Sequence, residues 1–260
     1  MTRAMWKGVV TFGDVHVPVK LYAAVQDRDI HFRLLHGADE VPVQQHMVNP
    51  DSGRVLPNDE VLKAYEDVDA LVILRDEELE ALAPEATRDI EILRFVDPHD
   101  ITEQWFDRPY YLGPDTNASQ YFALAEALKR QDKMGVARWT MRNKEYVGAL
   151  VPEGDHLMLI TLRNADEVIP ASVLEPPGGR QPDARELKLA QQLVSALESD
   201  FDPAEHHDEY RTRVLEFVEQ KAKGKAPVIR KLQPKRPGKR TLASALEASL
   251  KTVQKERKRA

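Results

Sequence analysis

The sequence predicts an α+β fold that is mainly β, with a barrel or a sandwich as its core. Short alternating or apolar runs recur up to residue 165, turn residues separate them, and few helical patterns lie between them. These runs indicate roughly eight to ten strands. Their number and spacing favour an antiparallel barrel or sandwich over a doubly wound sheet. The length of 260 residues suits one large domain or two modest ones.

The first two strands form a hairpin. Apolar residues occupy every second position from Val15 to Leu21, which is the period of a half-buried strand. Gly13 and Asp14 separate this run from the preceding one, and a glycine at that position suits a type II′ turn. Pro18 carries no N–H for a strand ladder, so we expect the second strand to be an edge strand or to be bulged there.

Further elements follow in order along the chain. The predicted strands are residues 30–36, two extended arms in 41–57 around a turn at 49–53, a buried strand at 71–74, and then 90–96, 108–115, 135–141, 146–151 and 156–163. The predicted helices are residues 58–64, 76–83, 117–130, 183–199, 202–221 and 241–253. Asn117 is a suitable N-cap, and so is Asp202, which has Pro203 at the first helical position. The proline-rich residues 170–182 mark the end of the β-rich part.

The positive charge gathers towards one end of the chain. The sequence carries 37 Lys and Arg against 43 Asp and Glu, a net charge of −6. Residues 221–260 hold 14 of the basic residues and 2 of the acidic ones, so their net charge is +12 and that of the remainder is −18. Residues 222–240 contain no acid and several prolines, and we expect them to be a disordered linker. A basic tail on an acidic body indicates a nucleic-acid or membrane-surface partner.

Composition excludes several kinds of site. The chain contains no cysteine, so it has no disulfide framework, thiolate metal site or cysteine nucleophile, which fits a reducing compartment. No apolar run approaches the roughly 20 residues that span a bilayer, and the N-terminus lacks an apolar signal region. We therefore expect a soluble, cytoplasmic protein.

Three groups of residues could be interpreted as catalytic or metal-binding. They are Asp14 with His16, His99 with Asp100, and His206 with His207 and Asp208. Adjacent histidines on a helix point to different faces, and no phosphate-binding glycine loop, nucleophile elbow or zinc-helix motif is present. We interpret all three groups as surface or capping residues. We expect no catalytic site, no metal and no other cofactor.

A basic segment lies within the otherwise acidic body. Its cations are Lys129, Arg130, Lys133, Arg138, Arg142 and Lys144, with Asp132 as the single acid among them. Trp139 and Met141 interleave with Arg138 and Arg142, which predicts a strand with one apolar and one cationic face. The alternative interpretation is a solvated basic face. With a basic tail beside it, the segment favours a polyanion, because phosphate neutralisation gives salt-sensitive binding without sequence specificity.

Five stretches carry a resemblance to a known family. They are MWKGVVTFGDVHVPVKLYAA at residues 5–24, RPYYLGPD at 108–115, ARWTMRNKEYVGAL at 137–150, ELKLAQQLVSALESDF at 186–201 and HHDEYRTRVLEFVEQK at 206–221. Together they resemble bacterial Ku, the homodimeric DNA-end-binding protein of non-homologous end joining. The resemblance runs from Arg3 to Gly224 and resumes with LASALEASLK. It implies a Ku-type β-barrel core with an extended arm, C-terminal helices and a disordered basic tail.

The resemblance also divides the chain. It implies a barrel core at residues 1–170 with the arm at 41–57, a helical part at 183–221, the basic linker at 222–240 and a terminal helix at 241–260. In the family two copies form a ring that a linear duplex threads, with contacts to sugar and phosphate. The implied partners are linear double-stranded DNA, a second copy of the chain and ATP-dependent DNA ligase D. No membrane partner is implied, and the expected location is the cytoplasm, at the nucleoid.

The residues expected to bind DNA come from the arm, the basic segment and the tail. They are Arg54, Lys129, Lys133, Arg138, Arg142, Lys144, Lys221, Lys223, Lys225, Arg230, Lys231, Lys235, Arg236, Lys239 and Arg240. Leu242, Leu246 and Leu250 lie in the segment that resembles the one recruiting ligase D. The arm departs from its relatives, which commonly carry several basic residues there, because Arg54 is its only certain cation. We hypothesise that the basic tail compensates.

Two other classes of function stay open on the sequence. An enzyme acting on nucleic acid would use carboxylates and histidines as metal ligands and would depend on His99 or His206. A soluble β-barrel adaptor would bind RNA, acidic membrane surfaces or other polyanions through the basic tail. Such an adaptor would not distinguish linear duplexes from closed circular ones.

Overall fold

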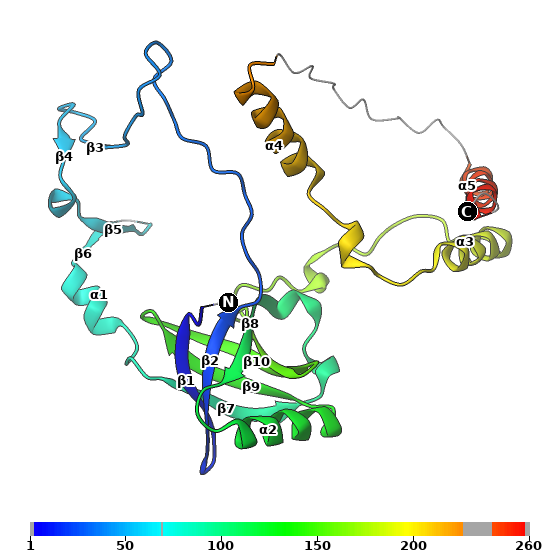
Figure 1. The fold of residues 1–260 in the computed structure, drawn as a ribbon, viewed down its shortest axis with the longest axis horizontal. Helices are drawn as coiled ribbons and strands as arrows, with labels where there is room; N and C mark the ends of the chain where they lie inside the picture. Colours follow the sequence, from blue (N-terminus) through cyan, green and yellow to red (C-terminus); the bar gives the residue numbers. More distant parts are fainter. Residues whose placement is uncertain (1–2, 69, 226–240, 258–260) are drawn as a thin grey trace. The chain divides into compact units, whose positions relative to one another are not determined.

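The computed structural model describes residues 3–68, 70–225 and 241–257. The chain divides into two compact units, Met1–Val173 and Leu174–Ala260 (Figure 1). Within the described ranges, no helix is both long enough and apolar enough to cross a membrane.

The first unit contains a closed β-barrel, which confirms the predicted fold class. In the described part of the chain its seven strands are β1 (Trp6–Phe12), β2 (Val15–Ala23), β7 (Asp89–Val96), β8 (Phe106–Pro114), β9 (Met134–Met141), β10 (Lys144–Glu153) and β11 (His156–Leu162). Their order around the barrel is β1-β2-β8-β11-β10-β9-β7. All neighbours are antiparallel except β1 and β7, whose parallel pairing closes the barrel. Bulges interrupt the register of β7 against β9 and of β11 against β8.

The opening hairpin forms as predicted, with Phe12 opposite Val15 across the turn and Gly13 at φ +53°. The expectation for Pro18 is only partly right: β2 lies between β1 and β8 and is not bulged against β1, but at Pro18 itself no β8 residue pairs with it. Pro18 lies opposite Val9, and the amide of Val9 donates to Arg88 on the far side of β1, at 2.8 Å. This pair therefore needs no N–H from the proline. On the other side of β2, the pairing with β8 begins only at Val19.

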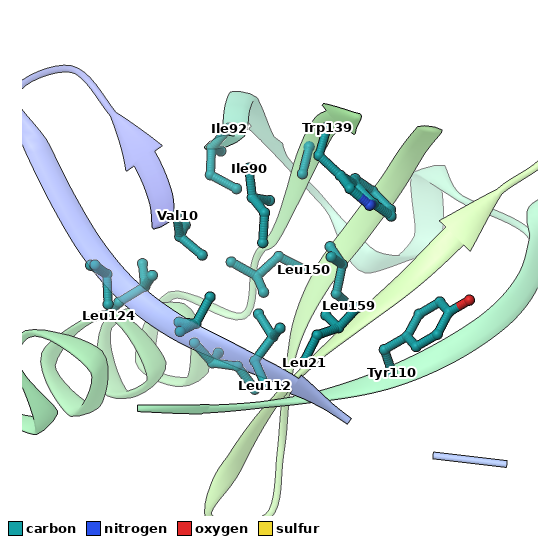
Figure 2. Close-up of a cluster of buried hydrophobic side chains, with 14 of the residues drawn as sticks. Val10, Leu21, Ile90, Ile92, Tyr110, Leu112, Leu124, Trp139, Leu150 and Leu159 are labelled. Atoms are coloured by element: carbon teal, nitrogen blue, oxygen red, sulfur yellow. The ribbon is translucent and has the colours of Figure 1, made fainter. Parts of the chain in front are cut away.

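Apolar side chains from all around the barrel fill its interior (Figure 2). Helix α2 (Ala118–Gln131) packs against β2, β8 and β10, strands from different sides of the barrel, and so covers one end of the core. Asn117 caps this helix, as predicted, by accepting from the amide of Gln120. The fully buried Tyr121 fixes the helix: its hydroxyl donates to the carbonyl of Leu112 at 2.6 Å and accepts from the amide of Leu157 at 2.7 Å.

Residues 24–88, between β2 and β7, form one insertion that contains the predicted arm at 41–57, and the whole insertion is called the arm from here on. Its elements are β3 (Met47–Val48), β4 (Val55–Leu56), a 3₁₀ turn at Asn58–Glu60, β5 (Lys63–Glu66), β6 (Leu71–Leu74) and α1 (Asp76–Leu82). The predicted turn at 49–53 joins β3 to β4, with the side chain of Asn49 accepting from the amides of Asp51 and Ser52. Of the described barrel strands, none pairs with a strand of the arm.

Three predictions for the arm are wrong. Residues 30–36 form no strand, because they find only one isolated bridge, from Leu35 to Pro42. The helix predicted at 58–64 stops after one turn, because the residues after it pair with β6 instead. The strand at 71–74 forms but is not buried: Leu71 is 68% exposed, because its sheet has two strands and no second layer among the described residues.

The second unit is helical, with α3 (Ala184–Leu197), α4 (Glu209–Ala222) and α5 (Leu242–Arg257). Asp183 and Glu186 form a capping box at the start of α3. The side chain of Glu186 also accepts from Arg180 at 2.7 Å, which together with the capping contact lowers the pKa of its carboxyl group. The predicted linker falls largely on residues 226–240, which lie outside the described ranges.

The predicted start of α4 at Asp202 is wrong. Asp202 does accept from the amide of Ala204, as an N-cap would, but the helix there is a single 3₁₀ turn, Pro203–Glu205. The ring of His206 stacks on Phe201 at 5.0 Å. Helix α4 begins only after Asp208, which accepts from the amide of Arg211. A good capping sequence therefore occurs twice within a few residues, and the second one starts the helix.

Replacing Tyr121 by phenylalanine should reduce the free energy of unfolding by about 1–3 kcal/mol, because it leaves a buried carbonyl and a buried amide without their shared partner. The midpoint of urea unfolding should fall without a change in the slope m. Tyr111→Phe, on the exposed side of β8, is the matched control and should change stability by less than about 0.5 kcal/mol. Equal effects of the two substitutions would contradict this role for the Tyr121 hydroxyl.

Candidate nucleic-acid interface

Strand β9 separates apolar from charged side chains, as its sequence predicts. Ala137, Trp139 and Met141 are buried in the core, and Arg138 between them is exposed. The indole ring of Trp139 stacks on Tyr146 of β10 at 5.5 Å and 17°. Gly148 makes room for that ring, since a Cβ at this position would lie 2.7 Å from it. The core thus fixes the face from which Arg138 projects.

A tight turn between β9 and β10 presents two further cations. Arg142 and Asn143 have φ of +54° and +60°, as a type I′ hairpin turn requires. Arg142 is exposed, and no carboxylate among the described residues forms an ion pair with it. Lys144 places its ammonium 5.4 Å from the centre of the Tyr146 ring. The turn therefore offers one unpaired guanidinium and one lysine ordered by an aromatic ring.

Arg138 is exposed but paired. Its guanidinium donates to Glu91 of β7 at 2.9 Å, and this contact raises the pKa of Arg138, with a smaller contribution from Glu145. A shallow polar pocket around it, of about 530 Å³, is also lined by Glu85 and Asp89. The surface around Arg138 thus holds more acid than base. The acidic neighbours come from β7, from β10 and from the residues just before β7, so the sequence of β9 alone does not reveal them.

At the other end of β9, Lys129 lies in the last turn of α2 and Lys133 lies between α2 and β9. Lys133 contacts the carboxylate of Asp97 at 3.4 Å, whereas Lys129 is exposed and has no ion-pair partner within the described ranges. Lys133 and Arg142 flank the eight residues of β9, which at about 3.3 Å per residue puts them more than about 20 Å apart. The basic segment is therefore a line of cations along one strand and not a single cluster.

The other predicted DNA-binding residues are spread through the chain. Arg54 of the arm donates to both carboxylate oxygens of Glu60, at 2.6 and 2.8 Å. In the second unit Lys221 and Lys223 lie at the end of α4, where Lys223 pairs with Glu219, and Lys225 is exposed just beyond. The remaining tail cations lie outside the described residues: Arg230, Lys231, Lys235, Arg236, Lys239 and Arg240.

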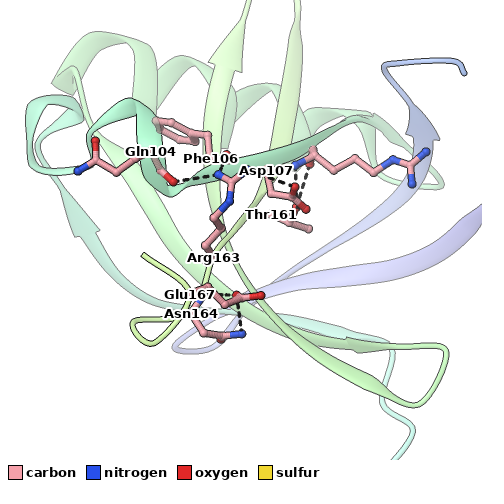
Figure 3. Close-up of polar contacts among 8 residues, drawn as sticks. Gln104, Phe106, Asp107, Thr161, Arg163, Asn164 and Glu167 are labelled. Atoms are coloured by element: carbon pink, nitrogen blue, oxygen red, sulfur yellow. Dashed lines mark hydrogen bonds and ion pairs between the residues drawn. The ribbon is translucent and has the colours of Figure 1, made fainter. Parts of the chain in front are cut away.

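Three further cations, which the sequence did not single out, make structural contacts. Lys7 and Lys20 lie on β1 and β2 and both pair with Asp115, which lowers the pKa of that carboxyl group. Arg163 donates to the backbone carbonyls of Gln104 and Phe106 and so ties the end of β11 to the start of β8 (Figure 3). These cations hold strands together.

Two of the three groups considered for catalysis lie in short turns and helix caps. Among the described residues, no cluster of three or more His, Cys, Asp or Glu side chains has the arrangement of a metal centre. His99 lies in a capped 3₁₀ turn, where its amide donates to Asp97 at 3.0 Å. His206 stacks on Phe201 outside any α-helix, and Asp208 caps α4.

Comparison with known protein families identifies the class to which this barrel belongs. Residues 11–189 match the family described as the Ku70/Ku80 beta-barrel domain. The chain belongs to the Ku family. The non-homologous end joining protein Ku of Anaeromyxobacter sp. (strain K) is 38% identical over 253 residues, which cover 96% of this chain and 86% of the relative. The protein of that name from Coxiella burnetii (strain RSA 331 / Henzerling II) is 36% identical, over 98% of this chain and 96% of its own length.

The unequal pairing of the cations gives a prediction for duplex binding. Arg142→Ala should weaken binding to a short blunt duplex and reduce the slope of log K against log salt by about one, since one phosphate contact is lost. Glu91→Gln should strengthen binding, because it frees Arg138. Fluorescence anisotropy across a salt series measures both effects. If Arg142→Ala has no effect at any salt concentration, the β9–β10 turn does not contact the duplex.

Proposed function

We propose that this protein is a non-catalytic homodimeric ring that binds the ends of double-stranded DNA in non-homologous end joining and recruits ligase D. Membership of the Ku family, over nearly the whole chain, is the observation that carries the proposal. The proposed location is the cytoplasm, at the nucleoid. The barrel is the scaffold, and the cations of β9 and its turn contact the backbone of the duplex.

The surface of the arm supports a second copy as partner. Leu62, Tyr65 and Leu71 are each more than 60% exposed, in a segment of about sixty residues whose described part contains no buried side chain. Tyr65 and Leu71 lie on opposite faces of the two-stranded β5–β6 sheet, and exposed apolar side chains on both faces mark surfaces that another chain covers. Leu187 and Val194 on α3 are similarly exposed. In a homodimer both surfaces would be buried, and the arms would close the ring.

The chemistry of the basic residues suits binding that ignores sequence. Lysine and arginine side chains that contact phosphates position a protein on the duplex but carry no sequence information, because every nucleotide presents the same backbone. Arg142 and Lys129 are unpaired within the described ranges, whereas Arg138, Lys133 and Arg54 must exchange a carboxylate for a phosphate. Exposed ion pairs contribute about 1 kcal/mol or less, so this exchange costs little. A ring topology would then supply the preference for ends.

A competition experiment tests the ring. We expect the protein to shift a labelled linear duplex in a gel, and unlabelled linear DNA to compete strongly, because a threaded ring needs a free end. Covalently closed circular DNA of the same sequence should compete at least tenfold less well. The same circle cut once with a restriction enzyme is the matched control and should regain full competition. Equal competition by closed and cut circles would overturn threading and would favour the polyanion-binding adaptor.

The basic tail gives a separate prediction. Ending the chain after Gly224 should lower duplex affinity and flatten its salt dependence, because most of the cations in the segment of charge +12 are lost. The preference for linear over closed DNA should remain, since the barrel and arm supply it. A full-length chain with glutamine at the six tail positions Arg230, Lys231, Lys235, Arg236, Lys239 and Arg240 separates loss of charge from loss of α5. Unchanged binding at low and high salt in both variants would contradict a role for the tail.

A further inference from the structure

The terminal helix α5 has a partner within its own unit. Its predicted apolar stripe faces α3: Leu250 is only 9% exposed, Leu246 is half-buried, and Leu242 at the start of the helix is 53% exposed. A lone helix of this length is marginally stable in water, so the contact with α3 is what holds it. The leucines expected to recruit ligase D are therefore not equally available in the free chain.

The contact has two parts, an ion pair and a mixed polar and apolar surface around Leu250. Near the start of α3, the guanidinium of Arg185 donates to Glu247 of α5 at 2.6 Å. Further along, Leu250 and Gln254 line a small cavity with side chains of α3 that include Gln192, Ser195 and Ala196. From the ion pair to the cavity, residue numbers increase along both helices. One ion pair therefore joins the start of α3 to α5, and a second contact lies further along both helices.

We propose that the face of α5 centred on Glu247 and Leu250 is a docking surface that α3 occupies in the free protein, and that a partner must displace α3 to bind it. This rests on the proposed recruitment of ligase D, for which it names a regulatory step. The partner must offer what α3 offers: a surface of small and uncharged polar side chains, such as Ser195 and Ala196, to receive Leu250, and a cation to meet Glu247. Since only the fraction of chains with α5 released can bind, the apparent affinity falls by that fraction.

The strength of the contact suits a reversible step. Arg185 and Glu247 are both largely solvent-exposed, at 75% and 41% for their side chains, so their ion pair is weak. The interface buries one leucine well and the others partly or little. The free energy needed to release α5 is therefore small compared with the binding free energy that a larger partner surface would supply. Leu242, already exposed, is the residue that a partner can contact first.

Charge reversal at Arg185 tests the proposal without changing α5. Arg185→Glu sets two carboxylates against each other, yet it places an acid in the first turn of α3, where an acid is favoured, so α3 should still fold. In the full-length protein, hydrogen exchange in α5 should become about threefold to tenfold faster. Binding to the cognate ligase D, measured by calorimetry, should tighten by a similar factor. Adding Glu247→Arg should restore slow exchange, because the ion pair re-forms with reversed polarity.

Two controls keep the outcomes distinct. Arg213→Glu on α4 makes the same change of charge away from the interface and should affect neither measurement. If exchange in α5 is unchanged by Arg185→Glu, α3 does not hold the helix and the inference fails, whatever the ligase does. A third outcome is that hydrogen exchange in α5 becomes faster in Arg185→Glu and slow again in the double variant, while ligase D binds neither the unaltered protein nor Arg185→Glu. In that case docking of α5 on α3 stands and the proposed recruitment fails. If Arg185→Glu makes hydrogen exchange in α5 faster but leaves the affinity for ligase D unchanged, α3 and the partner do not compete for α5 and the inference fails.

Discussion

Val10 of β1 lies opposite Ile90 of β7, and this parallel pairing closes the barrel. It also sets the position of the arm. Strands β2 and β7 both flank β1, so the chain leaves the barrel at Ala23 on one side of β1 and returns at Asp89 on the other. Because the barrel fixes both ends, a long insertion between them adds little entropic cost, since loop-closure entropy grows only slowly with length. The arm can therefore be extended and apolar without weakening the barrel that carries it.

The closed barrel also decides which cations are available. It brings β7 and β10 to either side of β9, and with them Glu91 and Glu145, which neutralise the surface around Arg138. The turn at Arg142 extends beyond these neighbours and keeps its charge. Single contacts of this kind are weak, and the body around them is acidic, so stable binding needs many phosphates to be met at once. An enclosing ring would meet this need, because it keeps a duplex close to every cation along its wall.

The sequence predicted the elements that depend on local residue patterns. It failed for features that depend on contacts between residues far apart in the sequence. Alternation placed Arg138 outside and Trp139 inside, and the Gly13 turn and the Asn117 cap follow from residue chemistry. The effect of Pro18 was not predicted fully, because whether its missing N–H matters depends on which side of β2 the proline nitrogen faces. The strand at 71–74 has the composition of a core strand, but nothing within the described chain covers it. The partners of Arg138 and Lys133 lie more than thirty residues away in sequence, which no local pattern reveals.

The terminal helix and the arm present the same physical problem in two forms. Each carries more apolar surface than its own segment can bury, and each therefore depends on a neighbour. For α5 the neighbour is α3, which covers Leu250 but leaves Leu242 exposed. For the arm, no described segment of this chain supplies a cover. Where a segment of the same chain covers an apolar surface weakly, another protein can displace that segment. Where no segment covers the surface, permanent association with another chain is favoured. The first is suited to recruiting an enzyme and the second to building a dimer.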